Sequence, residues 1–369
     1  SDGMPSARPP RLHPVRLQLK WYHQFQFAGY YAAQRKGFYE AEGLEVTILE
    51  GAPGPSPVTR VVEGAADFGV GDSEVVLARM SGKPVVACAA IFQHSPNVIL
   101  SLRDRGITTP SALVGRSVMV VSDQGSAQLR AMLRKEGIPL DRVTIVRHTQ
   151  DLADLVEGRV DAVSAYAMVE PNLLRRRGLE PTVMRMVDYG VDFYGDTLFT
   201  TEEQARQHPR RVGAFVRASL RGWAYALQHP EEVAEWILQL EGVQARGLTR
   251  ELLLEQAQGM MSYILPDVVP LGHMNQGRWE HIASVYASLD PTLGPPDLRG
   301  FVFDPHPSPD PAVQRYLLVF GAGSLGLTGL VLLWNAGIRR QVRQRTRELQ
   351  SEVARRQESE EGLRKALAE

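Results

Sequence analysis

The stretch VRLQLKWYHQFQFAGYYAAQRKGFYEAEGLEVTIL, residues 15–49, decides the fold of this 369-residue chain. Val15–Leu19 has the short apolar pattern of a strand, Ala28–Glu42 that of a helix closed by a glycine, and Leu44–Leu49 that of a second strand. The same alternation continues as far as Val187. It predicts α/β lobes on mainly parallel sheets, whose ligands bind at the carboxyl ends of the strands.

The composition excludes several classes of protein. The chain has 41 Lys and Arg against 42 Asp and Glu, so a general electrostatic affinity for nucleic acid is not expected. Cys88 is the only cysteine, which rules out an intramolecular disulfide and a multi-cysteine metal site. It lies in the apolar run Val85–Ala90 and is expected to be a small buried side chain. We expect no catalytic residue, metal or cofactor.

A second stretch, YLLVFGAGSLGLTGLVLLW at Tyr316–Trp334, contains no charge over 19 residues. About 20 apolar residues cross a bilayer core, so it predicts a transmembrane helix. Five arginines follow it between residues 339 and 347, which places its C-terminal side in the cytoplasm of a bacterial inner membrane. Residues 1–315 are then periplasmic or otherwise extracytoplasmic. Since Ser1–Pro10 does not resemble a signal peptide, we expect that a signal peptide or a first membrane helix has been removed or cut off.

The tail after this stretch, residues 335–369, consists almost wholly of helix-forming residues. Apolar and threonine side chains recur on two seven-residue repeats, at Val342, Leu349 and Leu363 and at Thr346, Val353 and Leu367. The tail predicts a short parallel coiled coil, broken by Arg356 and Glu360, that pairs two copies of the chain. The alternative is a solvated charged helix. The tail resembles the signalling helices of bacterial receptors, and we expect an output module to follow it.

The loop after the first predicted strand is dense in aromatic and amide side chains. Trp21 and Phe27 are candidates to stack on a flat ligand. Gln24 and Gln26 are candidates to bind its polar edge. The alternative is that two or three rings of this loop are core anchors.

Two later loops also follow predicted strands. Asp72 and Ser73 either cap the next helix or lie where its N–H groups bind a ligand. Gln124, Gly125 and Ser126 follow a strand in the same way and precede a predicted helix from Ala127. All five are candidate ligand-binding residues.

The remaining candidates lie in two segments of the second half. Tyr166 and Glu170 follow a strand at 160–164, and Glu170 either grips an amino-substituted ring or simply favours the helix dipole. Tyr189, Asp192 and Tyr194 belong to DYGVDFYGD, which its glycines make irregular. We expect that segment to clamp a ligand.

The string LKWYHQFQFAGYYAAQRKGFYEAEGLEVTI at 19–48 resembles the opening of the thiamine-pyrimidine-synthase-like (SsuA/THI-type) family. GAADFGVGDSEVVLAR, AYAMVEPNLL, DYGVDFYGDTLFTT and GHMNQGRWEHIASVYASL also fit its pattern, over residues 13–290. The resemblance implies a type II periplasmic-binding-protein fold, with two α/β lobes, a hinge and a cleft. It also implies that Trp21 stacks on the ligand and that Glu170 pairs with an aminopyrimidine.

The resemblance and the apolar stretch together suggest a domain order. It runs from a flexible segment (1–12) through a two-lobed ligand-binding domain (13–300), a linker (301–315) and a transmembrane helix (316–334) to a cytoplasmic signalling coiled coil (335–369).

We therefore expect the sensor region of a transmembrane receptor, of the histidine-kinase or diguanylate-cyclase type, that binds a planar nitrogen heterocycle such as a thiamine pyrimidine precursor. A membrane-tethered binding protein for an ABC importer is the alternative. A third possibility, the pyrimidine synthase, is disfavoured because the helix within 69–80 has neither lysine nor histidine and 192–196 replaces the cysteine-rich iron motif.

Overall fold

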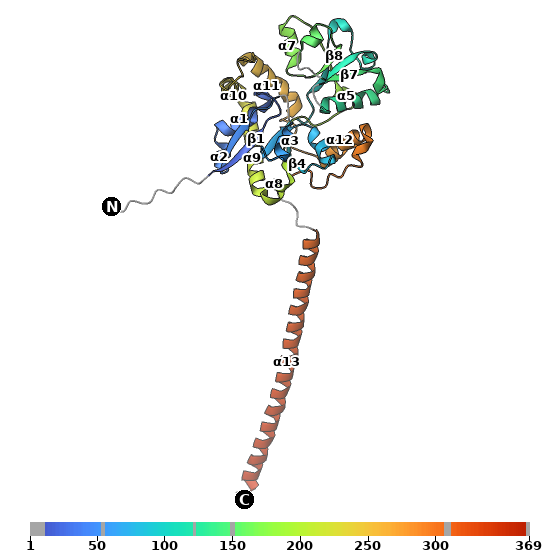
Figure 1. The fold of residues 1–369 in the computed structure, drawn as a ribbon. Coiled ribbons are helices and arrows are strands. Elements are labelled where there is room, and N and C mark those ends of the chain that lie inside the picture. The colour runs from blue at the N-terminus through green and yellow to red at the C-terminus, as the bar shows by residue number, and fades with distance from the viewer. Residues whose placement is uncertain (1–11, 53–55, 121–122, 148–151, 306–310, 367–369) are drawn as a thin grey trace, which may run out of the picture. The chain divides into compact units, whose positions relative to one another are not determined.

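The computed structural model describes residues 12–52, 56–120, 123–147, 152–305 and 311–366 (Figure 1). The chain divides into two compact units, Ser1–Pro305 and His306–Glu369. The first unit, called the body below, contains two α/β lobes, each built on its own five-stranded sheet.

The sheet of lobe 1 has the strand order β2-β1-β3-β10-β4. Its strands are β1 (His13–Gln18), β2 (Leu44–Leu49), β3 (Phe68–Gly71), β4 (Val85–Ala90) and β10 (Thr197–Thr201). β1 is parallel to both β2 and β3, whereas β10 runs antiparallel between β3 and β4. The carboxyl ends of β1 and β3 therefore meet at one edge of the sheet, where ligands of such sheets bind.

The sheet of lobe 2 has the order β7-β6-β8-β5-β9. Its strands are β5 (Asn97–Leu102), β6 (Ser117–Val120), β7 (Thr144–Arg147), β8 (Ala162–Tyr166) and β9 (Pro181–Arg185). β6 is parallel to β7 and β8, and β5 runs antiparallel to β8 and β9. The two-lobed α/β fold is thus confirmed. Each sheet is mainly parallel, as predicted, because four of its strands run in one direction and a single strand, β10 in lobe 1 and β5 in lobe 2, runs against them.

The helices pack on these sheets and between them (Figure 1). Those of the body are α1 (Ala28–Arg35), α2 (Phe38–Ala41), α3 (Pro57–Val62), α4 (Glu74–Met80), α5 (Asp123–Lys135), α6 (Ala153–Val156), α7 (Glu170–Arg176), α8 (Glu202–Gln207), α9 (Pro209–Gln228), α10 (Pro230–Leu238), α11 (Arg250–Ile264) and α12 (Gln276–Leu289). Short 3₁₀ turns lie at Phe25–Phe27, Arg103–Arg105, Pro110–Leu113, Leu140–Arg142, Met186–Tyr189 and Pro291–Leu293.

Two predicted helices differ from the observed ones. The helix expected over Ala28–Glu42 is split into α1 and α2 at Gly37, whose φ of 69° lies in the left-handed region that ends a helix. The helix expected from Ala127 already begins at Asp123, so it includes Gly125 and Ser126. A glycine inside a helix costs only about 1 kcal/mol, which the buried face of α5 offsets.

Two chain segments connect the lobes and are hydrogen-bonded to each other. The chain leaves lobe 1 through residues 91–96 and returns through 186–196. Ile91 N donates to Asp196 O at 2.8 Å, and Ser95 N donates to Phe193 O at 2.8 Å. We call these two segments the paired crossover; they lie where the resemblance predicts a hinge.

The body extends beyond the last helix of lobe 1. Phe301 is fully buried, and Ala87 N donates to its carbonyl oxygen at 2.8 Å. Phe303 N donates in turn to Ala87 O at 2.8 Å, so this segment continues the edge of the sheet beside β4. The segment predicted as a linker from residue 301 therefore begins inside the body, which ends at Pro305.

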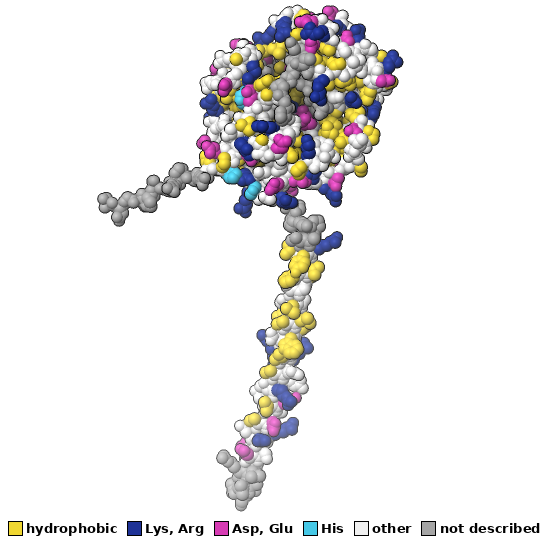
Figure 2. Space-filling view, viewed as in Figure 1, with side chains coloured by type: hydrophobic (Ala, Val, Ile, Leu, Met, Phe, Trp, Pro, Cys, Tyr) yellow, Lys and Arg dark blue, Asp and Glu magenta, His cyan; other side chains and the backbone are white. Residues whose placement is uncertain are grey.

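The second unit is one continuous helix, α13 (Pro311–Ala366). Its first part exposes apolar side chains and its later part carries charged ones (Figure 2). Tyr316 and Trp334 are 71% and 74% exposed. Among the described residues, α13 is long and apolar enough to cross a membrane by length and composition alone. The membrane span and the coiled coil stay predictions.

Candidate ligand-binding site

The candidate site is built around Lys20, which follows β1 at its carboxyl end. Its Nζ donates to Asp72 Oδ2 at 3.1 Å, to Asp196 Oδ1 at 3.2 Å and to the Tyr166 hydroxyl at 2.5 Å. These three partners match the three donors of an ammonium group. Asp72 follows β3 of lobe 1, Asp196 ends the paired crossover, and Tyr166 ends β8 of lobe 2. One side chain therefore links both lobes and the hinge.

The two carboxylates around Lys20 are buried and hydrogen-bonded. Asp72 Oδ1 accepts from Glu74 N, the first N–H group of α4, at 2.9 Å, so Asp72 both binds the start of that helix and pairs with Lys20. Asp196 Oδ2 accepts from Gln26 Nε2 at 2.7 Å, and Gln26 Oε1 accepts from Gln24 Nε2 at 2.6 Å. The cluster holds one cation against two carboxylates and is net negative when all three are ionised.

The protonation of this cluster follows from burial and charge together. Burial alone lowers the pKa of Lys20, but Asp196 and Asp72 outweigh it and hold that pKa well above its usual value. Burial raises the pKa of Asp196 above its ordinary range, and the charge of Lys20 and the Gln26 hydrogen bond only partly oppose it. The two carboxylates therefore favour the charged form of Lys20.

Glu170 lies beside this cluster, at the start of α7. Its Oε2 accepts from Tyr166 N at 2.7 Å, which closes the turn that we call the 166–170 turn. Burial raises the pKa of Glu170 to about 7, and the backbone N–H bonds it accepts oppose that rise. The side chain keeps some solvent exposure. Near neutral pH it can thus both donate and accept hydrogen bonds.

Five of the predicted site residues come together here: Gln24, Gln26, Asp72, Tyr166 and Glu170. Trp21 lies next to Lys20 in sequence, is partly buried and meets Tyr22 edge-on at 5.4 Å. Ser73 is fully buried and donates to Tyr194 O at 2.7 Å, so it fixes the crossover to α4.

Two predicted aromatic residues lie in the core instead. Phe27 is fully buried, which is the core-anchor alternative for its loop. Tyr194 is 1% exposed, its ring packs at 4.8 Å from that of Trp279, and its hydroxyl accepts from Asn275 N at 3.0 Å. Both rings lie in segments outside the strands, where neighbouring side chains are buried as well: Phe25 and Gln26 beside Phe27, and Phe193 beside Tyr194.

The expected clamp formed by DYGVDFYGD is part of the hinge. Asp192 Oδ1 lies 2.6 Å from His94 Nδ1 and 2.8 Å from Arg278 Nη2, which ties both crossover segments to α12. Tyr189 is partly buried against the core beneath α5. Neither residue bonds to the Lys20 cluster, because Asp192 is engaged by His94 and Arg278 and Tyr189 packs on the core.

The third predicted loop lies within a helix. Gly125 and Ser126 belong to the first turn of α5, with Gly125 buried. Gln124 belongs to the same turn, and its side chain lies outside the described residues.

Lys20 and Asp196 are the site residues that the sequence reasoning missed. The available signal was a lone lysine directly after the buried end of a strand, because a buried ammonium needs carboxylate partners. Asp196 is separated from Lys20 by 176 residues, and only the crossover brings the two together.

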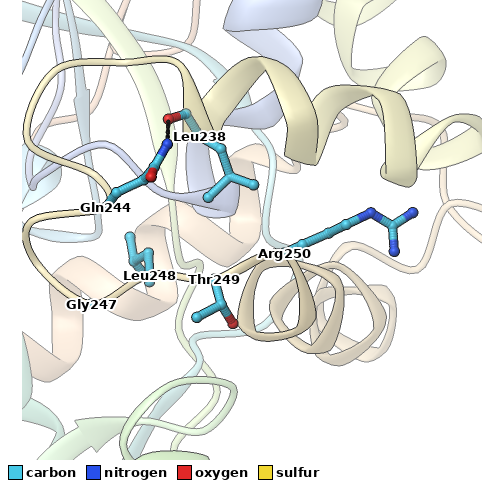
Figure 3. A pocket seen from close by; sticks show the side chains of 6 residues that line it. All are labelled: Leu238, Gln244, Gly247, Leu248, Thr249 and Arg250. Atoms are coloured by element: carbon cyan, nitrogen blue, oxygen red, sulfur yellow. Dashed lines mark hydrogen bonds between the residues drawn. The ribbon is translucent and has the colours of Figure 1, made fainter.

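A separate hollow of about 380 Å³ lies at the loop between α10 and α11 (Figure 3). Gln244 Nε2 donates to Leu238 O at 2.9 Å across it. The Arg250 side chain extends away from the other labelled residues and pairs with Glu235 at 2.9 Å. Its lining thus brings together fewer charged groups than the Lys20 cluster, which is the better candidate site.

Comparison with known proteins gives a consistent result. A family model described as NMT1/THI5 like matches residues 24–233. The riboflavin-binding protein RibY of Chloroflexus aurantiacus is 31% identical over 64% of this chain and 68% of its own length. The formylaminopyrimidine-binding protein of Halalkalibacterium halodurans is 26% identical over 74% and 84%.

Among solved structures, the periplasmic aliphatic sulphonate binding protein SsuA from Escherichia coli has a similar fold. Its TM-score is 0.61 at 16% identity, and the match covers 80% of this chain and 94% of that one. This likeness shows the periplasmic-binding-protein fold.

Proposed function

The chain belongs to the NMT1/THI5-like family, and on this premise we propose that its body binds a small planar nitrogen heterocycle, such as a thiamine pyrimidine precursor. The names of two relatives give riboflavin and formylaminopyrimidine as ligands, and both are planar nitrogen heterocycles. The residues that carry the proposal are Trp21, Tyr166 and Glu170, with Lys20 and its carboxylates at the base.

The charge of the site supports this class of ligand over an anion. Lys20 directs all its donors to Asp72, Asp196 and Tyr166, so its charge is already neutralised. A sulfonate would then face carboxylates, which repel it in a poorly solvated site. An amino-substituted ring would instead present N–H donors to acceptors.

Glu170 supports the aminopyrimidine class in particular. A carboxyl group with a pKa of about 7 is partly protonated at neutral pH. It can donate to a ring nitrogen while it accepts from the adjacent amino group. A partly exposed aromatic such as Trp21 can cover the face of the same ring.

Ligand binding is tested by thermal unfolding of the full chain in detergent micelles with a panel of heterocycles. At about 100 times Kd, 4-amino-5-hydroxymethyl-2-methylpyrimidine or its formylamino relative should stabilise the protein by about 2.7 kcal/mol. An alkanesulfonate serves as the control and should leave the melting temperature unchanged. Stabilisation by the sulfonate alone, or by no heterocycle, would contradict the proposal.

The whole chain is proposed to be the sensor region of a transmembrane receptor, with the body outside and the end of α13 in the cytoplasm. The supporting observation is the continuity of α13 from its apolar stretch into the charged tail. A helix without interruption can transmit a displacement along its length. A tethered binding protein for an importer is the second candidate, because the named relatives are binding proteins.

Disulfide crosslinking separates these candidates. A Leu349→Cys variant in membranes should form crosslinked dimers, because position 349 lies on the predicted seam. Arg347→Cys, two residues away on another face, is the matched control and should remain monomeric. Equal crosslinking at both positions would contradict the coiled coil and favour a simple tether.

A further inference from the structure

Gly259 lies in the middle of α11, where a glycine costs about 1 kcal/mol relative to alanine. A Cβ at this position would lie 2.8 Å from Met168 Cβ and 3.6 Å from Met168 Cα. Real side chains do not approach so closely, and the obstructing atom belongs to the rigid base of its side chain. The missing Cβ therefore allows the 166–170 turn to reach α11.

This contact joins the two lobes. α11 belongs to lobe 1, since Met260 is fully buried in its core and Gln256 Oε1 accepts from Phe25 N at 3.0 Å. Met168 comes from lobe 2, yet it is 5% exposed and packs within the lobe 1 core. One turn earlier on α11, Glu255 pairs with Arg176 of α7 at 2.7 Å. The turn is thus seated on α11 by a close apolar contact and an ion pair.

The seated turn carries the candidate ligand contacts of lobe 2. Tyr166 and Glu170 flank Met168 by two residues on either side, and Val169 N donates to Tyr166 O at 2.9 Å. Because the turn is short and internally hydrogen-bonded, a displacement of Met168 also moves both neighbours. The position of Met168 on α11 therefore determines how Tyr166 meets Lys20.

We propose that Gly259 is a positioning residue for ligand binding: it seats Met168 so that Tyr166 and Glu170 close on the Lys20 cluster. The effect on ligand binding rests on the proposed function. The contact between Gly259 and Met168 rests on the structure alone. Gly259 touches no ligand itself.

The test replaces Gly259 by alanine in the full chain. Alanine favours α11 by about 1 kcal/mol, which offsets part of the cost of displacing Met168, so the unliganded protein should remain folded. The added Cβ should unseat the turn and weaken binding of 4-amino-5-hydroxymethyl-2-methylpyrimidine by about tenfold or more. Met168→Gly in the same chain removes the opposing Cβ and should restore affinity. Gly213→Ala is the control, because its Cβ meets only the end of the flexible Arg217 side chain, at 3.3 Å, and Pro305 at 4.0 Å.

A second readout needs no ligand. Spin labels at Lys83→Cys in lobe 1 and Glu180→Cys in lobe 2 report the distance between the lobes, both sites being exposed. Gly259→Ala should shift that distance to longer values, and Met168→Gly should reverse the shift. An unchanged distance would overturn the proposed seat. If the distance shifts while no heterocycle binds even the unaltered protein, the ligand proposal fails and the seat stands.

Discussion

Replacing Lys20 by methionine is expected to lower the free energy of unfolding by about 3–5 kcal/mol, because it leaves a buried pair of carboxylates without their cation. The side chains of Asp72 and Asp196 are only 7% and 2% exposed, so water cannot replace the ammonium group. Tyr166 also loses its partner in lobe 1, so ligand binding should fail as well. Urea unfolding followed by tryptophan fluorescence measures the stability.

Two variants make this result specific. Lys83→Met changes an exposed lysine in the same way and should alter stability by less than about 0.5 kcal/mol. Adding Asp196→Asn to Lys20→Met removes one uncompensated charge and should recover part of the loss. If Lys20→Met destabilises no more than Lys83→Met does, the cluster is not the centre of the site.

Replacing Glu170 by glutamine is expected to weaken binding of an aminopyrimidine by about 1.5–3 kcal/mol, roughly 10- to 150-fold, because an amide cannot share a proton with the ring nitrogen and the charge-assisted hydrogen bond is lost. Isothermal titration calorimetry of the full chain at pH 7 measures this loss of affinity. Glu180→Gln, an exposed change of the same kind, is the control. Equal affinity in all three proteins would remove Glu170 from the site.

The same substitution should alter the pH dependence of stability. The pKa of Glu170 rises from 4.5 to about 7 on folding, so the folded state holds its proton more tightly. The contribution of Glu170 to the free energy of unfolding is therefore fully present below pH 4.5 and is lost as the pH rises through about 7. Glu170→Gln should flatten this part of the profile, and an unchanged slope between pH 5 and pH 8 would argue against the raised pKa.

Local pattern predicted the elements whose apolar residues follow a clear period. Strands β1 and β2 belong to this class, and so does the helical stretch between them, although the break at Gly37 was not predicted. β5, β9 and β10 were not predicted, and two of them set the antiparallel pairings. β5 and β10 each follow one segment of the paired crossover. Their partner strands therefore depend on how the lobes connect, and a local sequence period carries no information about that connection.

The site shows the same limit. Position after a strand selected Asp72 and Tyr166 as candidates, and the structure brings both of them to Lys20. Tyr194 and Asp192 were selected as part of an irregular segment, and their side chains meet Asn275 and His94 instead, since side-chain direction in such a segment depends on its distant partners. Asp196, two residues further, turns instead toward Lys20.

The paired crossover has a mechanical consequence. Two peptide segments joined by hydrogen bonds, such as Ile91 N to Asp196 O, bend as a strip but resist twisting and shear. Opening of the body is then restricted to essentially one angular coordinate. Asp196 belongs to the paired crossover and also accepts a hydrogen bond from Lys20. The candidate ligand site and the bending segment therefore share one residue. A change at the Lys20 cluster should therefore alter the bending of the paired crossover, and the reverse should hold as well.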